Sequence, residues 1–101
     1  MEEKEFCGIT STLKVIGSKW TILILRDLFE GKKRFGELQQ SLGTISPKTL
    51  SLRLQQLEED SIITKKIFPE VPLHVEYALT QKGKSLHHII ADLRDWGEQH
   101  H

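Results

Sequence analysis

The spacing of apolar residues changes near residue 61, and this change limits the folds open to the chain. Before it, apolar residues recur every three to four positions, which is the period of helices that bury one face. From residue 62 to residue 79 they alternate with polar ones, the period of half-buried strands. The pattern predicts a mainly α fold that carries one small β-hairpin (α+β).

Four helical segments precede the change. We expect them over 9–16, 19–29, 35–42 and 47 to about 60. Gly17 and Ser18 separate the first two, and the second is apolar nearly all round, which is typical of a central buried helix. Ser46 is the expected N-cap of the fourth, with Pro47 in the first helical position.

The third and fourth helices are separated by a short turn that contains Gly43, which is the helix-turn-helix spacing. Two strands follow, 62–68 and 74–79, joined by the turn P-E-V-P at 69–72. Thr80 is then expected to cap one last helix. Its apolar stripe is Leu86, Ile89, Ile90, Leu93 and Trp96. The order predicts a winged helix-turn-helix, with the hairpin as the wing.

The charges of the chain sum to zero but are unevenly placed. The 101 residues hold 14 basic and 14 acidic groups, with a net +4 over 32–53 and a net −2 in both 1–5 and 92–101. We find no repeat and no linker, so one domain is expected over 1–101, with its core at about 7–96. The basic middle favours a nucleic-acid face, although chance alone produces fluctuations of this kind.

The fourth helix carries side chains that suit double-stranded DNA. The candidate DNA-binding residues begin with Ser46 at the start of the helix. Among them, the side chains suited to base edges are Lys48, Thr49, Leu52 and Gln56. Those suited to phosphate are Ser51 and Arg53. On the wing and the loop before the third helix, the candidates are Lys65, Lys66, His74 and Arg34. The alternative is that these groups only solvate the surface.

Three stretches of the chain carry a family resemblance. They are LKVIGSKWTILILRDLFEGKKRFGEL (13–38), ISPKTLSLRLQQLEED (45–60) and PEVPLHVEYALTQKGKSL (69–86), with Cys7 ahead of them. With these motifs the chain closely resembles the HxlR-type winged-helix transcriptional regulators, which are related in architecture to the MarR regulators. The resemblance implies a homodimeric DNA-binding repressor or activator with dimerisation helices at both ends. The expected dimer contacts are Ile9, Leu13, Ile16, Leu86, Ile90, Leu93 and Trp96.

Two positions depart from the family pattern. Gly8 stands where the family usually has proline after the cysteine, and Ser61 stands where it usually has glycine after the fourth helix. If the backbone at Ser61 is left-handed, serine costs on the order of 1 kcal/mol there.

Cys7 is the only cysteine, so it forms no internal disulfide, as is usual in a reducing cytosol. Several HxlR-type regulators sense electrophiles or oxidants through this N-terminal cysteine, and the resemblance implies the same for Cys7. A position just before a helix favours the thiolate that such chemistry needs. The alternative for Cys7 is a small buried hydrophobe.

Other classes of function find little support in the residues. His87 and His88 are adjacent rather than four apart, and His100 and His101 end the sequence, so no metal site is predicted. We expect no cofactor, no enzyme activity, no membrane segment and a cytoplasmic protein, with a small-molecule inducer left open. Many DNA-binding domains are basic, whereas the pI of this chain is about 7.0, so one alternative to a DNA-binding regulator stays open. That alternative is a dimeric winged-helix module for protein interactions that does not read DNA.

Overall fold

The computed structural model describes residues 7–101, so the acidic segment 1–5 lies outside the described residues. The helices are α2 (Gly8–Ile16), α3 (Lys19–Leu28), α4 (Phe35–Leu42), α5 (Pro47–Glu59), α6 (Gln81–Lys84) and α7 (His87–Gln99). The strands are β1 (Lys33–Arg34), β2 (Ile63–Phe68) and β3 (His74–Leu79). The predicted winged helix-turn-helix is confirmed. Within 7–101, no helix combines the length and apolar character that crossing a membrane requires.

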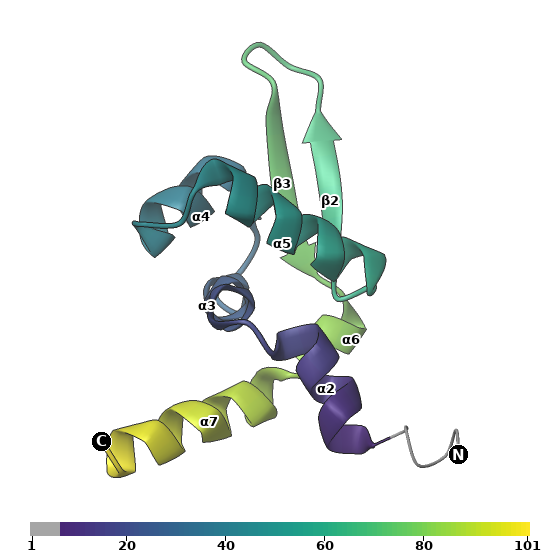
Figure 1. Cartoon of the computed structure of the whole chain (residues 1–101). Helices are drawn as coiled ribbons and strands as arrows, with labels where there is room; N and C mark the ends of the chain where they lie inside the picture. The colour runs from purple at the N-terminus through teal and green to yellow at the C-terminus, as the bar shows by residue number, and fades with distance from the viewer. Residues whose placement is uncertain (1–6) are drawn as a thin grey trace.

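Helix α3 is central, as its nearly all-round apolar sequence predicts. Figure 1 shows α5 crossing above α3, α4 beside α5, and the β2–β3 hairpin rising behind α5 and extending past it. Ile24 and Leu25 of α3 are fully buried, and so are Leu38 of α4 and Leu50 of α5. The core therefore joins the helix-turn-helix to α3 and holds α5 at the surface.

The sheet has three antiparallel strands in the order β1-β3-β2, with one more strand than the sequence predicts. Strand β1 has only two residues, which is too few to show a period. Lys65 pairs with the buried Tyr77, and Lys66 pairs with Glu76. Because directly paired residues point to the same face of a sheet, Lys65 shares the face of Tyr77 and Lys66 shares the face of Glu76.

The predicted start of α5 is confirmed. The Oγ of Ser46 accepts a hydrogen bond from the backbone N–H of Thr49 at 3.0 Å, and Pro47 occupies the first turn. The backbone at Ser61 has a φ of 60°, so the left-handed conformation considered from the sequence is present.

The predicted single C-terminal helix is wrong, because the chain forms α6 and α7 with a break at Ser85 and Leu86. Thr80 caps only α6, and its Oγ1 also donates to the carbonyl oxygen of Ile62 at 3.1 Å. A Cβ on Gly83 would overlap the same carbonyl oxygen. Helix α6 is therefore pressed against the start of β2, and α7 leaves in another direction (Figure 1).

The expected dimer residues divide into two sets. Ile16 and Ile90 are buried in the core of the chain itself, and Leu86 is partly buried against it. Four side chains remain exposed on α2 and α7. These are Ile9 (73%), Leu13 (55%), Leu93 (51%) and Trp96 (66%).

Candidate nucleic-acid interface

Helix α5 presents a polar outer face. Leu50, Leu54 and Leu57 are buried beneath it, so the residues on the other side of the helix are directed to solvent. Lys48 and Ser51 are exposed there, and Leu52 is an apolar side chain that is 46% exposed. A helix with basic, hydroxyl and apolar groups on one open face has the chemistry that reads a major groove.

Gln55 belongs to this outer face although it is not among the residues chosen from the sequence. It is exposed, and its Nε2 lies 3.4 Å from Oε2 of Glu59 one turn later. The 100° rotation per residue places Gln55 close to Lys48 and Leu52, so the helical period was the available signal.

Ser46 and Thr49 are joined by hydrogen bonds at the start of α5. The Oγ of Ser46 donates to Oγ1 of Thr49 at 2.9 Å, in addition to its capping bond. Their hydroxyls thus maintain the first turn of α5, and Thr49 is half-buried.

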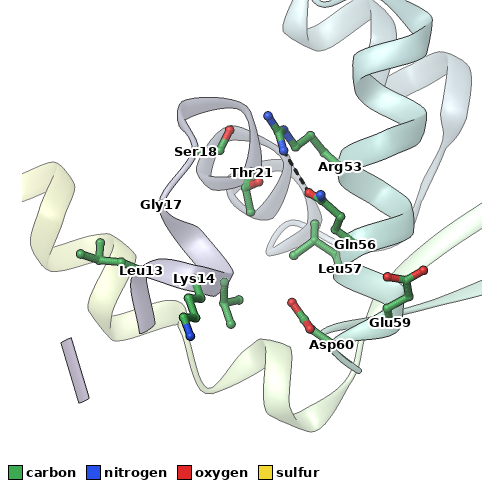
Figure 2. A pocket seen from close by; sticks show the side chains of 11 residues that line it. Leu13, Lys14, Gly17, Ser18, Thr21, Arg53, Gln56, Leu57, Glu59 and Asp60 are labelled. Atoms are coloured by element: carbon green, nitrogen blue, oxygen red, sulfur yellow. Dashed lines mark hydrogen bonds between the residues drawn. The ribbon is translucent and has the colours of Figure 1, made fainter. Parts of the chain in front are cut away.

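Arg53 and Gln56 lie differently from the expectation. Their side chains point toward the corner between α2 and α3, and Nη1 of Arg53 donates to Oε1 of Gln56 at 3.0 Å (Figure 2). Both line a pocket with residues of that corner. Gln56 is therefore directed to the flank of α5 rather than to the face that carries Lys48.

On the wing, Lys65 and Lys66 are exposed, with Nζ of Lys66 lying 5.0 Å from the centre of the Phe68 ring. His74 is not the free wing-tip group that the sequence indicates. Its ring stacks on Phe68 at 4.5 Å, with ring nitrogens 3.7 Å from Glu70 and 3.6 Å from Glu76. Only 16% of the His74 side chain is exposed, because the alternation of the strand turns it onto its neighbours.

The two lysines of the basic loop before α4 form ion pairs with carboxylates of the chain itself. Lys32 lies 3.7 Å from Glu76, and Lys33 lies 3.3 Å from Glu30. The backbone N–H of Arg34 donates to Oε1 of Glu37 at 2.8 Å, which fixes the start of α4. The exposed Arg34 borders a hollow that also touches Leu73 and His74, so the fold brings this cation to the wing.

Cys7 occupies the N-cap position of α2 and is exposed. The Cys7 side chain makes no capping bond, but the backbone N–H of Thr10, then that of Ile9 and the Thr10 hydroxyl, favour the thiolate and lower the pKa of the Cys7 thiol. An exposed thiol with a lowered pKa has the reactivity of a nucleophilic cysteine rather than of a core residue. Across residues 7–101, no group of three or more histidine, cysteine or carboxylate side chains is placed to hold a metal ion.

Comparisons with known proteins agree with this geometry. The HxlR-like helix-turn-helix family model matches residues 15–101. YdeP of Bacillus subtilis, an HTH-type transcriptional regulator, is 38% identical over 99 residues, covering 98% of this chain and 77% of YdeP.

Two solved structures extend the comparison. The redox regulator HypR in its oxidized form matches with a TM-score of 0.88 at 37% identity, over 94% of this chain and 98% of that one. Diamide-treated YodB from B. subtilis matches with a TM-score of 0.77 at 34% identity, over 94% of this chain and 95% of that one. This chain therefore belongs to the HxlR-like helix-turn-helix family and is a transcriptional regulator rather than an enzyme.

Proposed function

We propose that this regulator is a cytoplasmic homodimer that binds a pseudo-palindromic operator in double-stranded DNA through α5. The observation that carries the proposal is the open outer face of α5, formed by Lys48, Ser51, Leu52 and Gln55, beside the wing of a helix-turn-helix protein. Two such helices related by a two-fold axis read half-sites about 10 bp, or a multiple of that, apart.

The side chains of α5 have distinct roles in this proposal. Lys48 suits the acceptors of guanine, Gln55 suits adenine, and Leu52 suits the methyl group of thymine. Ser51 and the one wing lysine on the face turned to DNA, Lys65 or Lys66, contact phosphate, which positions the protein without specifying a sequence. The wing tip adds no cation between Phe68 and Leu73, so the charge of the wing comes from Arg34 and Lys66 on the face of Glu76 and from Lys65 on the opposite face.

The exposed apolar residues of α2 and α7 support the homodimer. All residues from Asp92 to His101 are exposed, and α7 meets the core through Leu86, Ile89 and Ile90. A groove of about 590 Å³ between α3 and α7 is lined by Leu23, Phe29 and Leu93 among others. Exposed apolar faces of this kind are typical of subunit interfaces.

Cys7 is the proposed sensor of electrophiles or oxidants. It lies at the start of α2, the helix that carries Ile9 and Leu13 of the proposed dimer interface, and its thiol pKa is lowered. HypR is a redox regulator, and YodB has been solved after diamide treatment, which agrees with a thiol-based response in this fold. With no second cysteine in the chain, oxidation at Cys7 ends in a disulfide between subunits or with a small thiol.

DNA binding is tested by selecting duplexes from a random pool and measuring the affinity of the selected duplex at several salt concentrations. We expect a pseudo-palindrome, bound at least 1,000-fold more tightly than an unrelated duplex, with affinity falling steeply with salt. A protein-interaction module would enrich no sequence, and that result would refute the proposal.

The sensor is tested on the same duplex with wild type and Cys7→Ser, before and after diamide or quinone treatment. We expect treated wild type to bind more weakly by a factor of about 5 to 150, and Cys7→Ser to bind normally and not respond. An unchanged wild-type affinity after mass spectrometry shows complete modification of Cys7 would leave the cysteine without a sensing role.

A further inference from the structure

A hollow of about 480 Å³ lies where the chain passes from the sheet into the C-terminal helices. It is bounded by the end of α3 with the loop that follows, by the end of β3, by α6 and by the start of α7. These segments come from the two halves of the sequence, so no local pattern indicates the hollow. The residues used below are Leu28, Phe29, Lys32, Leu79, Lys84 and His87.

The inner surface of the hollow is apolar. Leu28 is buried in the core, and Phe29 and Leu79 are half-buried against it. The Phe29 ring meets the His87 imidazole edge to face, with 4.8 Å between ring centres and 83° between ring planes. An apolar surface with a positioned aromatic ring suits a flat apolar ligand, and the volume is that of a small-molecule site.

The rim of the hollow is cationic. Lys84 of α6 is exposed and forms no ion pair with any residue in the described part of the chain. Lys32 adds a second ammonium, which lies 3.7 Å from the carboxylate of Glu76. Of the residues that line the hollow only Glu30 is acidic, and its carboxylate is neutralised by Lys33 at 3.3 Å. The charge left at the rim is therefore positive and suits an anion.

The hollow lies away from the proposed DNA-binding face. Figure 1 shows α6 and α7 at the end of the molecule opposite the wing tip. The outer-face residues of α5 and the residues of the wing tip do not line the hollow. The anion that fits it is therefore a free small molecule rather than a DNA phosphate. One unpaired lysine beside an apolar surface matches the single charge of a carboxylate.

We propose that this hollow binds a small carboxylate with a flat apolar body. Lys84 contacts the carboxylate, with Lys32 beside it, and the body packs on Phe29 and Leu79. Binding of this ligand does not depend on DNA. Its effect on operator affinity rests on the proposed function.

The hollow spans the break between the two C-terminal helices. Helix α6 ends at Lys84 and α7 begins at His87, and both residues line the hollow. A ligand that contacts both sides of the break holds the angle at which α7 leaves the domain, and α7 carries Leu93 and Trp96 of the proposed dimer interface. Because two α5 helices fit successive grooves only at one separation, the bound ligand changes operator affinity.

Binding is tested by isothermal titration calorimetry of the wild-type protein with benzoate, cinnamate and 2-naphthoate at low ionic strength. We expect saturable binding of 2-naphthoate, with a Kd of about 10–100 μM. The amide 2-naphthamide has the same body without the charge and should bind at least about tenfold more weakly. Failure of all three carboxylates to bind, or equal binding of the amide, would overturn the proposal.

Two variants locate the ligand, and a third is the control. Lys84→Gln should weaken 2-naphthoate about tenfold and leave 2-naphthamide unchanged. Ala78→Leu narrows the hollow without a change of charge and should abolish binding of both. The matched control is Lys82→Gln, because Lys82 lies on the same helix but donates to the carbonyl oxygen of Asp60 at 3.0 Å, outside the hollow.

Thermal melts by circular dichroism confirm that each variant folds. If Ala78→Leu does not fold, the exposed position of Lys84 lets Lys84→Gln decide. A folded Lys84→Gln protein that binds 2-naphthoate with wild-type affinity would overturn the site.

The effect on DNA is tested by fluorescence anisotropy of a selected operator with and without saturating 2-naphthoate. We expect operator affinity to shift by a factor of about 5 to 150, and the operator-bound protein to bind 2-naphthoate with an affinity changed by the same factor. An unchanged operator affinity in the saturated protein would refute the coupling through α7. Failure of the ligand-free wild type to bind any duplex would instead refute the proposed DNA binding, and the calorimetric result would still decide the ligand site.

Discussion

Two residues sit at corners where the backbone constrains the side chain. A Cβ on Gly17 would overlap the carbonyl oxygen of Leu13, so the α2–α3 corner requires glycine. Ser61 has a φ of 60° after α5, where the family pattern has glycine and this chain does not. The residue at the first corner is therefore the glycine that the packing requires, whereas the backbone of Ser61 at the second corner is strained.

Replacing Ser61 with glycine should stabilise the protein. Relief of the left-handed strain, about 1–2 kcal/mol, exceeds the added entropy of the unfolded chain. We expect a net gain of about 0.5–1 kcal/mol, seen as a melting temperature about 2–6 °C higher. Ser61→Ala serves as the control and should give no such gain, and equal melting temperatures for Ser61→Gly and wild type would contradict the strain.

The lowered pKa of Cys7 should be visible in its alkylation rate. Because N–H and hydroxyl donors stabilise the thiolate in the folded chain, iodoacetamide should react half-maximally at a lower pH than in the urea-unfolded chain. The same difference adds folding stability that is complete above the unfolded pKa and is lost as the pH falls through the folded pKa. Thr10→Val should move the midpoint part of the way up, and identical midpoints for folded and unfolded protein would refute the assignment.

Among the elements, the short helix α6 depends on two of its residues. Thr80 caps it by accepting a hydrogen bond from the backbone N–H of Gly83. The position of α6 depends on the absence of a side chain at Gly83, against the carbonyl oxygen of Ile62. Gly83→Ala should lower stability by about 1–3 kcal/mol, as overpacking does. Gly36→Ala in α4, where a Cβ meets nothing within 4 Å, should be neutral or stabilising by up to about 1 kcal/mol. Chemical denaturation of both variants checks the contrast, and equal losses would contradict it.

Helix α5 has an outer face and a flank, and substitutions on each should act differently. Lys48→Ala removes a side chain directed to the groove, so base preference should relax at one position of each half-site, by about 1–3 kcal/mol. Gln56→Ala should leave base preference unchanged, because its side chain lines the pocket beside Arg53. Binding to operator variants with single base changes measures both, and a changed preference in Gln56→Ala would reverse this assignment of faces.

For the whole molecule, the exposed apolar residues of α7 allow folding and dimerisation to be separated. Leu93→Asp places a charge on a side chain that is 51% exposed, so the chain should fold but sediment as a monomer at tens of micromolar. Ile90→Asp places a charge on a side chain that is 8% exposed and should unfold the chain. A wild-type protein that is monomeric under these conditions would refute the homodimer.

The sequence by itself determined the order and type of most elements, because helical and strand periods, the Ser46 cap and the glycine turns are local properties. It also identified the outer face of α5, since Leu50, Leu54 and Leu57 define the buried side through the helical period alone. The family resemblance rested on the same local motifs and was confirmed.

Only the tertiary structure decided what the flanking side chains face. Arg53 and Gln56 turn to the α2–α3 corner, which is distant from them in the sequence. His74 is held between Phe68, which lies across the turn of the hairpin, and the carboxylates of Glu70 and Glu76. Strand β1 exists only because β3 pairs with it, and the packing of Gly83 on Ile62 places α6 against the start of β2. A helical or strand period gives the average direction of a side chain, whereas its contacts depend on which other elements fold against it.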